Sequence, residues 1–138
     1  MSKWDDFPRL PEPVQARILL EVASAAWKQQ SAFGDIKAEV QEYLKLGYEL
    51  LEGRCEKLPQ LIKFLDDPEM AHDFGAFYER LKDNKSAAAA LDIASYACGF
   101  VSRMVAKKCQ YGPLPDPVLE ALPDIYEYYQ EQAALLGV

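Results

Sequence analysis

Apolar residues recur every three or four positions along most of the chain, and this spacing predicts α-helices. No stretch shows the sustained alternation of apolar and polar residues that a half-buried β-strand requires. The pattern contains no internal repeat and no linker, so residues 1–138 are expected to form one helical domain, with residues 1–10 as an N-terminal arm. The predicted fold is an all-α bundle of five or six helices.

Proline, glycine and capping residues predict the limits of the first two helices. The first is expected to begin after the segment Pro11-Glu12-Pro13, because proline is tolerated at the first helical position, and to run to about Gln29. The second is expected to have Asp35 as its N-cap and to end at Gly53. The first helix carries two adjacent apolar sets, so we expect it to be contacted from two sides. These sets are Val14, Ile18, Val22, Ala25 and Ala26, and next to them Leu19, Leu20, Ala23 and Trp27.

Two shorter helices are predicted in the middle of the chain. One covers about residues 58–65. The other is expected to start at Asp67, as its N-cap, with Pro68 at the first helical position. Gly75 lies inside this helix and weakens it by about 1 kcal/mol relative to alanine. The apolar residues assigned to it are Met70, Phe74, Phe77, Tyr78 and Leu81.

The longest uninterrupted helical pattern covers about residues 86–110, with Ser86 as its predicted N-cap. Many residues of its apolar face are small, and small side chains allow neighbouring helices to approach closely. This segment is therefore predicted to be a central helix surrounded by the others. Its apolar face consists of Ala87, Ala90, Leu91, Ala94, Ala97, Cys98, Val101, Met104 and Val105.

The last helix is expected to open at Asp116 and Pro117 and to close at Gly137. Pro123 lies inside it and lacks a backbone donor, so it is predicted to kink the helix or to split off its first turn. One stripe of this helix is apolar and is expected to face the core. It consists of Val118, Leu122, Ile125, Tyr129, Ala133 and Leu136.

The composition fits a single folded domain that needs neither a metal nor a disulfide. The chain has 138 residues, 50% of them hydrophobic, which is enough to bury one core. Twenty-two acidic residues against fifteen basic residues give a formal net charge of -7 and a pI near 4.7. This charge repels nucleic-acid phosphates and anionic lipid surfaces, so neither nucleic acid nor a membrane is expected as a direct partner.

The sequence pattern favours a cytoplasmic location. It contains no run of about 18 apolar residues, and its start carries Asp5 and Asp6 where a signal peptide has a basic and then an apolar region. The three cysteines, Cys55, Cys98 and Cys109, are odd in number and far apart in sequence. They are expected to be reduced thiols rather than a disulfide framework.

Residues suited to catalysis or metal binding are scarce. His72 is the only histidine, and its surroundings lack the pattern of a nucleophile with its base. Glu69 and His72 give one Glu-x-x-His match, but helical metal sites of that type need a second copy. No glycine-rich phosphate loop occurs. Asp66 is interpreted as a solvated residue and Asp67 as a helix cap. We therefore expect no enzyme activity, no cofactor and no metal.

The most informative feature is the charge of residues 116–138, which include five acids and no lysine or arginine. On a continuous helix these acids would form one stripe with Tyr128 beside it. Two interpretations stay open: a solvated outer face, or a surface that binds a basic protein partner through carboxylates and a tyrosine anchor. The candidate partner-binding residues are Asp116, Glu120, Asp124, Glu127, Tyr128 and Glu131. Asp66, Asp67, Glu69 and Asp73 would extend this surface if the fold brings them near.

Two segments in the second half of the chain carry a resemblance to a known family. Residues 90–100, ALDIASYACGF, and residues 114–120, LPDPVLE, look like the all-helical immunity proteins of bacterial polymorphic toxin systems. The likeness covers the last third to half of the chain and provides no residue-level toxin contacts. It implies a protein that binds and neutralises a cognate toxin domain, often a nuclease, by covering its active or substrate-binding surface inside the producing cell.

Other functions would use the same sequence features differently. A helical adaptor or regulatory module would share the acidic surface but bind an unrelated partner. A small metal protein or enzyme would depend on His72, and self-association would use the wide apolar face of the first helix. The oligomeric state stays open at this stage.

Overall fold

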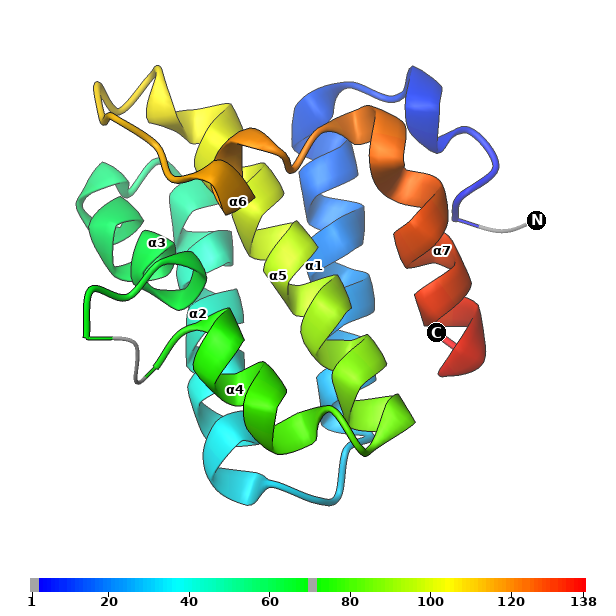
Figure 1. Ribbon diagram of the computed structural model, residues 1–138. Helices are drawn as coiled ribbons and strands as arrows, with labels where there is room; N and C mark the ends of the chain where they lie inside the picture. The colour runs from blue at the N-terminus through cyan, green and yellow to red at the C-terminus, as the bar shows by residue number, and fades with distance from the viewer. Residues whose placement is uncertain (1–2, 70–71) are drawn as a thin grey trace.

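Helix α5 (Lys85–Ala106) lies in the middle of the molecule, and each of the other six α-helices contacts it (Figure 1). The computed structural model describes residues 3–69 and 72–138. Within these residues there is no β-strand, so the predicted all-α bundle around a long central helix is confirmed. The other α-helices are α1 (Glu12–Lys28), α2 (Gly34–Leu51), α3 (Leu58–Leu65), α4 (Phe74–Leu81), α6 (Asp116–Leu119) and α7 (Tyr126–Leu135), and the 3-10 helices are η1 (Phe7–Arg9), η2 (Cys55–Lys57) and η3 (Pro123–Ile125).

The small side chains of α5 explain its central position. Its predicted apolar face is buried, apart from the half-buried Met104. The helices around it come close enough for the buried Trp27 indole to donate a hydrogen bond to the carbonyl oxygen of Ala90 at 2.8 Å. Among the described residues, α5 is also the one helix that is long and apolar enough to cross a membrane. Most of its surface lies inside the protein, which is typical of the core helix of a globular domain.

Helix α1 contacts the core mainly through the second of its two apolar sets. Leu19, Leu20 and Trp27 are completely buried. In the first set, however, Val14 is 42% exposed and Ala25 is exposed, so the prediction that this set is covered is wrong at these positions. Val22 and Ala26 of the first set are completely buried. The second set contacts both neighbouring helices, since Leu20 lies beside Gly47 of α2 and Trp27 donates a hydrogen bond to Ala90 of α5.

Most predicted helix limits agree with the structure to within a few residues. Helix α3 has the predicted limits, and α2 ends beside Gly53, whose φ of +96° favours glycine. The start of α5 differs, because the side chain of Asn84, rather than Ser86, accepts the capping hydrogen bond from the backbone N–H of Ala87 at 3.0 Å. The Ser86 hydroxyl instead accepts a hydrogen bond from Nε2 of Gln30 at 3.1 Å.

The predicted start of the fourth helix at Asp67 is wrong. Asp67 is buried, and its carboxylate accepts hydrogen bonds from the backbone N–H groups of Glu69 and His72. The chain therefore turns at this point instead of entering a helix. Asp73 caps α4 by accepting a hydrogen bond from the backbone N–H three residues later at 3.0 Å. Met70, which was assigned to this helix, lies outside the described residues.

The predicted last helix is divided into three elements: α6 ends at Leu119, and Pro123 opens the 3-10 helix η3, which precedes α7. Pro123 begins η3, and the regular helix α7 starts only after it, because proline cannot donate a helical hydrogen bond. Val118 and Ala133 are buried, as predicted for the apolar stripe. Leu122 and Ile125 are 41% and 39% exposed, which corrects their assignment to the core. The break in the helix turns these two side chains toward the surface.

The described part of the N-terminal arm packs against the bundle. Trp4 and Phe7 are buried, and the ring of Phe7 lies 5.0 Å from the ring of Tyr126, measured between centroids. The side chain of Gln15, on α1, donates a hydrogen bond from Nε2 to the carbonyl oxygen of Phe7 at 2.7 Å. These contacts hold the start of α7 against α1.

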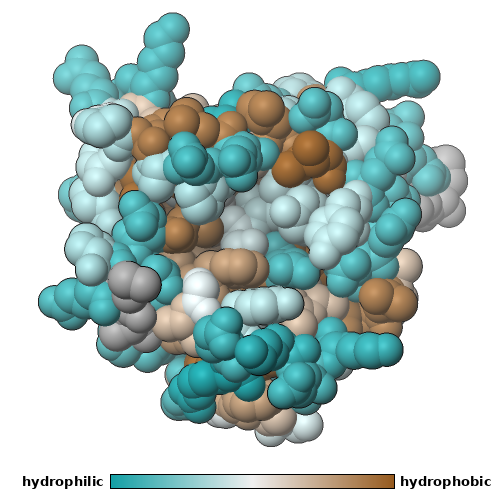
Figure 2. Space-filling view, viewed as in Figure 1, coloured by the Kyte–Doolittle hydropathy of each residue, from teal (hydrophilic) through white to brown (hydrophobic). Residues whose placement is uncertain are grey.

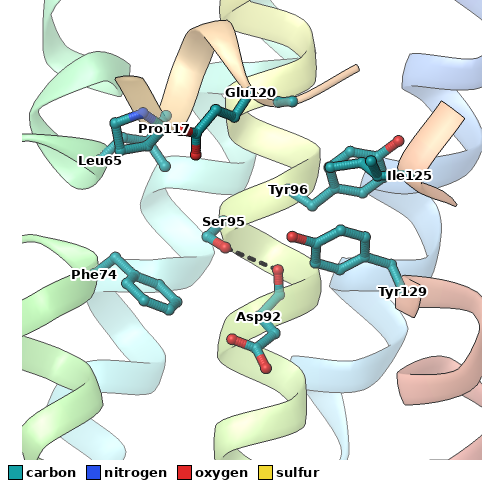
Figure 3. A pocket seen from close by; sticks show the side chains of 10 residues that line it. Leu65, Phe74, Asp92, Ser95, Tyr96, Pro117, Glu120, Ile125 and Tyr129 are labelled. Carbon is teal, nitrogen blue, oxygen red and sulfur yellow. Dashed lines mark hydrogen bonds between the residues drawn. The ribbon is translucent and has the colours of Figure 1, made fainter. Parts of the chain in front are cut away.

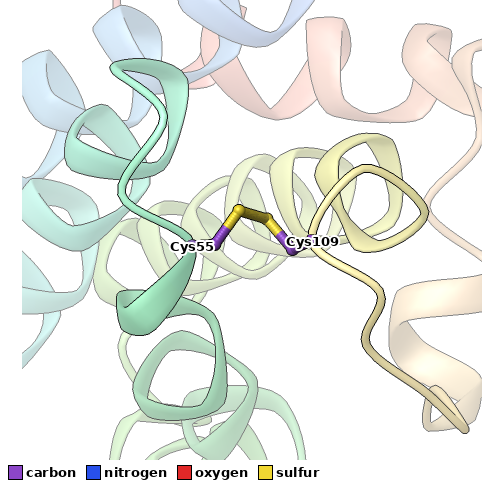
Figure 4. Close-up of a disulfide and its surroundings, with 2 residues drawn as sticks. All are labelled: Cys55 and Cys109. Carbon is purple, nitrogen blue, oxygen red and sulfur yellow. A yellow bond between two sulfur atoms is a disulfide. The ribbon is translucent and has the colours of Figure 1, made fainter.

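A disulfide joins Cys55 to Cys109, which contradicts the prediction of three reduced thiols (Figure 4). It connects η2 with the turn after α5, and the two Cα atoms lie 5.3 Å apart although 54 residues separate them in sequence. The prediction was wrong because sequence spacing does not report the distance between two cysteines in the folded chain. Cys98 is the free cysteine, and it is buried in the core as its place on the apolar face of α5 predicts.

Loss of this disulfide is expected to destabilise the fold. A bond that closes a loop across 54 residues restricts the unfolded chain, and such a bond contributes roughly 2–4 kcal/mol. Urea unfolding of the oxidised protein and of the Cys55→Ser, Cys109→Ser variant should differ by this amount. As a control, a reducing agent should lower the stability of the oxidised protein and leave that of the variant unchanged. Equal stability of the two proteins would contradict the expectation.

Candidate functional site

All six predicted partner-binding residues are exposed, but they do not form one continuous stripe. The interruption of the last helix divides them between three elements and the turns that connect these elements. Asp116 lies on α6, Glu120 just after it, Asp124 in η3, and Glu127, Tyr128 and Glu131 on α7. The single-stripe geometry is therefore wrong, and the relation of each residue to its neighbours has to be taken from the fold.

The acids of residues 116–131 keep their charges unpaired within the described chain. The ion pairs of the described residues involve other carboxylates. Arg80 pairs with Asp35 at 2.6 Å, so Asp35 takes part in an ion pair instead of acting as the predicted N-cap of α2. Arg103 pairs with Glu12 at 2.5 Å. The negative charge at the end of the chain is therefore available to a partner.

A cleft of about 290 Å³ lies between α4, α5 and the segment from α6 to α7 (Figure 3). Phe74 of α4 and Tyr129 of α7 lie on opposite sides of it, and Asp92 of α5 lies between them. Glu120, one of the predicted residues, directs a second carboxylate toward the cleft from the α6 side. The cleft thus brings together acidic and aromatic side chains from segments that are far apart in sequence.

Asp92 is the half-buried acid of this cleft. Its carboxylate accepts a hydrogen bond from the hydroxyl of Tyr128 at 3.3 Å, and no basic side chain of the described residues forms an ion pair with it. Burial raises the pKa of the Asp92 carboxyl above its ordinary value, and the hydrogen bond from Tyr128 lowers that pKa part of the way back. A carboxylate with a raised pKa in a cleft is typical of functional sites.

Tyrosines from α5 and α7 form one wall of the cleft. The rings of Tyr96 and Tyr129 stack with their centroids 4.0 Å apart. The hydroxyl of Tyr96 donates a hydrogen bond to the carbonyl oxygen of Leu122 at 2.6 Å, which holds the turn between α6 and α7 against α5. Burial, together with the nearby charge of Asp92, raises the pKa of Tyr129 to about 12, so its hydroxyl is protonated at neutral pH.

The surface around the cleft is apolar as well as acidic. Leu119, Leu122 and Ile125 are exposed, and Tyr128 is 51% exposed. Figure 2 shows apolar and polar surface side by side on this side of the molecule. Exposed apolar and tyrosine side chains next to carboxylates are typical of surfaces that bind proteins. We refer to Asp92, Glu120, Asp124, Tyr128, Glu131, Leu119, Leu122 and Ile125 as the acidic face.

The fold relates the predicted residues to the cleft in different ways. Glu120 lines the cleft, and Tyr128 is connected to it by the hydrogen bond from its hydroxyl to the carboxylate of Asp92. Asp124 and Glu131 lie near enough to the tyrosines of this region for their charges to help raise the pKa values of those tyrosines. Asp116 and Glu127 are exposed, and neither lines the cleft.

Sequence reasoning missed Asp92 and Phe74 as site residues and assigned Tyr129 to the core. One signal could have identified Asp92: it is the only charged residue between Lys85 and Arg103. Charged residues are rarely placed inside a buried apolar helix without a functional or structural reason. No comparable signal marks Phe74 or Tyr129, because aromatic residues at helical spacing are usually core residues.

The remaining sequence candidates have structural roles or lie away from the cleft. His72 is exposed, and its Nδ1 lies 2.9 Å from a carboxylate oxygen of Glu39. The carboxylates of Asp67 and Asp73 bind backbone N–H groups before and at the start of α4, so they do not extend the acidic face. Asp66 and Glu69 are exposed, and neither lines the cleft. Within residues 3–69 and 72–138, no three His, Cys, Asp or Glu side chains are grouped so as to hold a metal ion.

Comparisons with protein-family models, with curated proteins and with solved structures found no match for this chain. A helical bundle by itself does not assign a function, because the same architecture supports many activities. The function therefore has to be inferred from the geometry and chemistry of the acidic face.

Gly99 sets the distance between α5 and the α6 side of the cleft. A Cβ atom at this position would lie 3.0 Å from the Cβ of Ala121 and 3.1 Å from the carbonyl oxygen of Pro117. Gly99→Ala is therefore expected to push the cleft wall outward and to destabilise the protein by roughly 1–3 kcal/mol in urea unfolding. The matched control is Gly75→Ala on the exposed side of α4, which should stabilise by roughly 0.5–1 kcal/mol. The expectation fails if both alanines have the same effect.

Asp92→Asn is expected to stabilise the protein near neutral pH. Because the pKa of Asp92 is higher in the folded protein than the ordinary value of 3.8, ionisation of this group favours the unfolded chain. The free-energy cost of ionising Asp92 in the folded protein is absent below pH 3.8. It grows as the pH rises and is complete above the folded-state pKa. Urea unfolding should show a higher free energy of unfolding for the variant at pH 7 and no such gain in strong acid. A clear loss of stability at pH 7 would show that the carboxylate supports the fold.

Proposed function

We propose that this protein is an immunity protein that binds a cognate toxin domain and neutralises it by covering the active or substrate-binding surface of the toxin. The observation that supports this most directly is the acidic face, where unpaired carboxylates, an exposed tyrosine and exposed apolar side chains surround a cleft. The resemblance of residues 90–100 and 114–120 to helical immunity proteins supports the same class. Asp92 lies in the first of these segments and Glu120 in the second.

Charge explains why such a face suits a toxin that acts on nucleic acid. A nuclease holds phosphate groups, so its substrate-binding surface is basic. The acidic face, on a chain with a formal net charge of -7, is complementary to such a surface. Oppositely charged surfaces attract each other over about 10 Å at moderate salt, which raises the association rate. A protein that acts in this way needs no catalytic group of its own.

The side chains of the acidic face would have two roles in binding, anchoring the partner and steering it. Tyr128 offers a large and largely exposed contact area, and its hydrogen bond to Asp92 restricts its motion before the partner arrives. A side chain that is already ordered loses less entropy on binding, so Tyr128 suits the role of an anchor. Glu120, Asp124 and Glu131 provide the charge that steers and orients the partner.

We assign the protein to the cytoplasm, where a producing cell meets its own toxin. The negative net charge and the core position of the apolar helix α5 are compatible with this location. The disulfide between Cys55 and Cys109 is the observation that counts against it, because cytosolic proteins rarely keep disulfides.

Charge reversal on the acidic face tests the proposed function. Co-purification with the product of the adjacent gene identifies the partner, and surface plasmon resonance then measures binding. In Glu120→Lys, Asp124→Lys, Glu131→Lys, the association rate at low salt should fall by about tenfold or more, because steering is reversed. Protection from the toxin in cells should fall with it, while the thermal stability should stay nearly unchanged.

A second triple variant controls for the change in net charge. Glu21→Lys, Glu42→Lys, Glu52→Lys alters three exposed acids on α1 and α2 and at the end of α2. It should bind the toxin nearly as well as the unmodified protein. Unaltered binding by the acidic-face variant would remove this face from the proposal. A partner without toxic activity would instead support the alternative of a helical adaptor or regulatory module.

A further inference from the structure

We propose that the cleft of the acidic face binds the guanidinium group of a single arginine side chain presented by the protein partner. This inference rests on the proposed function, because it specifies which chemical group of the toxin enters the protein. The charge, the walls and the size of the cleft all suit such a group (Figure 3). The side chains concerned are Phe74, Asp92, Ser95, Glu120 and Tyr129.

The charge of the cleft selects a cation. The carboxylates of Asp92 and Glu120 border it, and neither forms an ion pair with a basic side chain of the described residues. Arg103, on the same helix as Asp92, is engaged elsewhere: its Nη2 donates to Glu12 at 2.5 Å and its Nε donates to the carbonyl oxygen of Ala121 at 2.9 Å. A half-buried carboxylate without a counter-charge is unfavourable, and a cation from a partner would compensate it.

The walls of the cleft favour a flat cation. Phe74 and Tyr129 contribute aromatic rings from opposite sides, and the hydroxyl of Tyr129 points toward the space beside Asp92 and Ser95. A guanidinium group is planar, stacks on aromatic rings and donates hydrogen bonds in its plane to carboxylate and hydroxyl oxygens. An ammonium group lacks this shape, so lysine is expected to bind more weakly than arginine.

The size of the cleft fits one side chain. Its volume of about 290 Å³ lies just below the range of roughly 300–1,000 Å³ that is typical of small-molecule sites, so it suits a single side chain. Leu65 and Ile125 also line it and offer apolar contacts to the methylene groups of an arginine.

A second surface hollow gives a useful contrast. It lies between α2 and α3 and is also lined by two acids, Glu39 and Glu42. Unlike the cleft, this hollow has a basic side chain, Lys63, in its own lining beside the two acids. This hollow therefore provides the control site.

The probe for the cleft is N-acetyl-arginine N-methylamide, titrated into the ¹⁵N-labelled full-length protein and followed by NMR. The backbone amide signals of Asp92, Ser95 and Tyr129 are expected to shift in a saturable way, with a dissociation constant on the order of millimolar. The citrulline analogue has the same shape without the charge and should produce no such shifts, and the lysine analogue should bind several-fold more weakly. Equal shifts from citrulline, or arginine shifts confined to other residues, would overturn the inference.

Variants connect the probe to the partner. Asp92→Asn, Glu120→Gln should weaken binding of the arginine probe by about tenfold or more and should also weaken toxin binding. Glu42→Gln, in the control hollow, should change neither. If the double variant leaves the probe or the toxin unaffected while the acidic-face triple variant still loses the toxin, the inference is wrong and the proposed function stands. If the triple variant keeps full toxin binding, the proposed function is wrong.

Discussion

The close approach of six helices to α5 is the constraint on which the rest of this structure depends. Alanine and glycine residues occupy much of the surface of α5, so its neighbours pack directly against its backbone and bury a continuous apolar core. The same packing creates the cleft, because α4 and α7 approach α5 from opposite sides of Asp92. Gly99 shows how tight this arrangement is, since even one methyl group would meet the neighbouring chain. The candidate site is therefore part of the core architecture rather than a loop added to it.

The sequence predicts where the helices lie along the chain but not how far apart they lie in the fold. Proline, glycine and a spacing of three or four residues act locally, so they predicted α3, the central helix and the break in the last helix. They could not predict that Phe74 and Tyr129 lie on either side of Asp92, because that arrangement depends on contacts between distant segments. The pairing of Cys55 with Cys109 was missed for the same reason. The acidic composition of the chain end was visible, but its distribution over three elements follows from the break.

Asp92 shows how a position that is unfavourable for folding can indicate function. A carboxylate whose pKa is raised by burial disfavours the folded state at neutral pH, and a hydrogen bond from Tyr128 partly offsets this. Other acids in the chain, such as Asp35 and Glu12, have arginine partners. The difference between these acids and Asp92 supports the proposal that the counter-charge of Asp92 comes from another molecule. Binding sites often keep such groups although they lower the stability of the free protein.

The disulfide places the two sides of the cleft in different parts of the chain. Phe74 and Asp92 belong to the ring of chain that the bond between Cys55 and Cys109 closes. Glu120 and Tyr129 belong to the tail that follows this ring. The tail continues from the ring through the backbone after Cys109 and packs back onto it through noncovalent contacts, such as the hydrogen bond from the Tyr96 hydroxyl to the carbonyl oxygen of Leu122. The disulfide therefore restrains the side of the cleft that carries Asp92, while the position of the other side depends on how the tail packs.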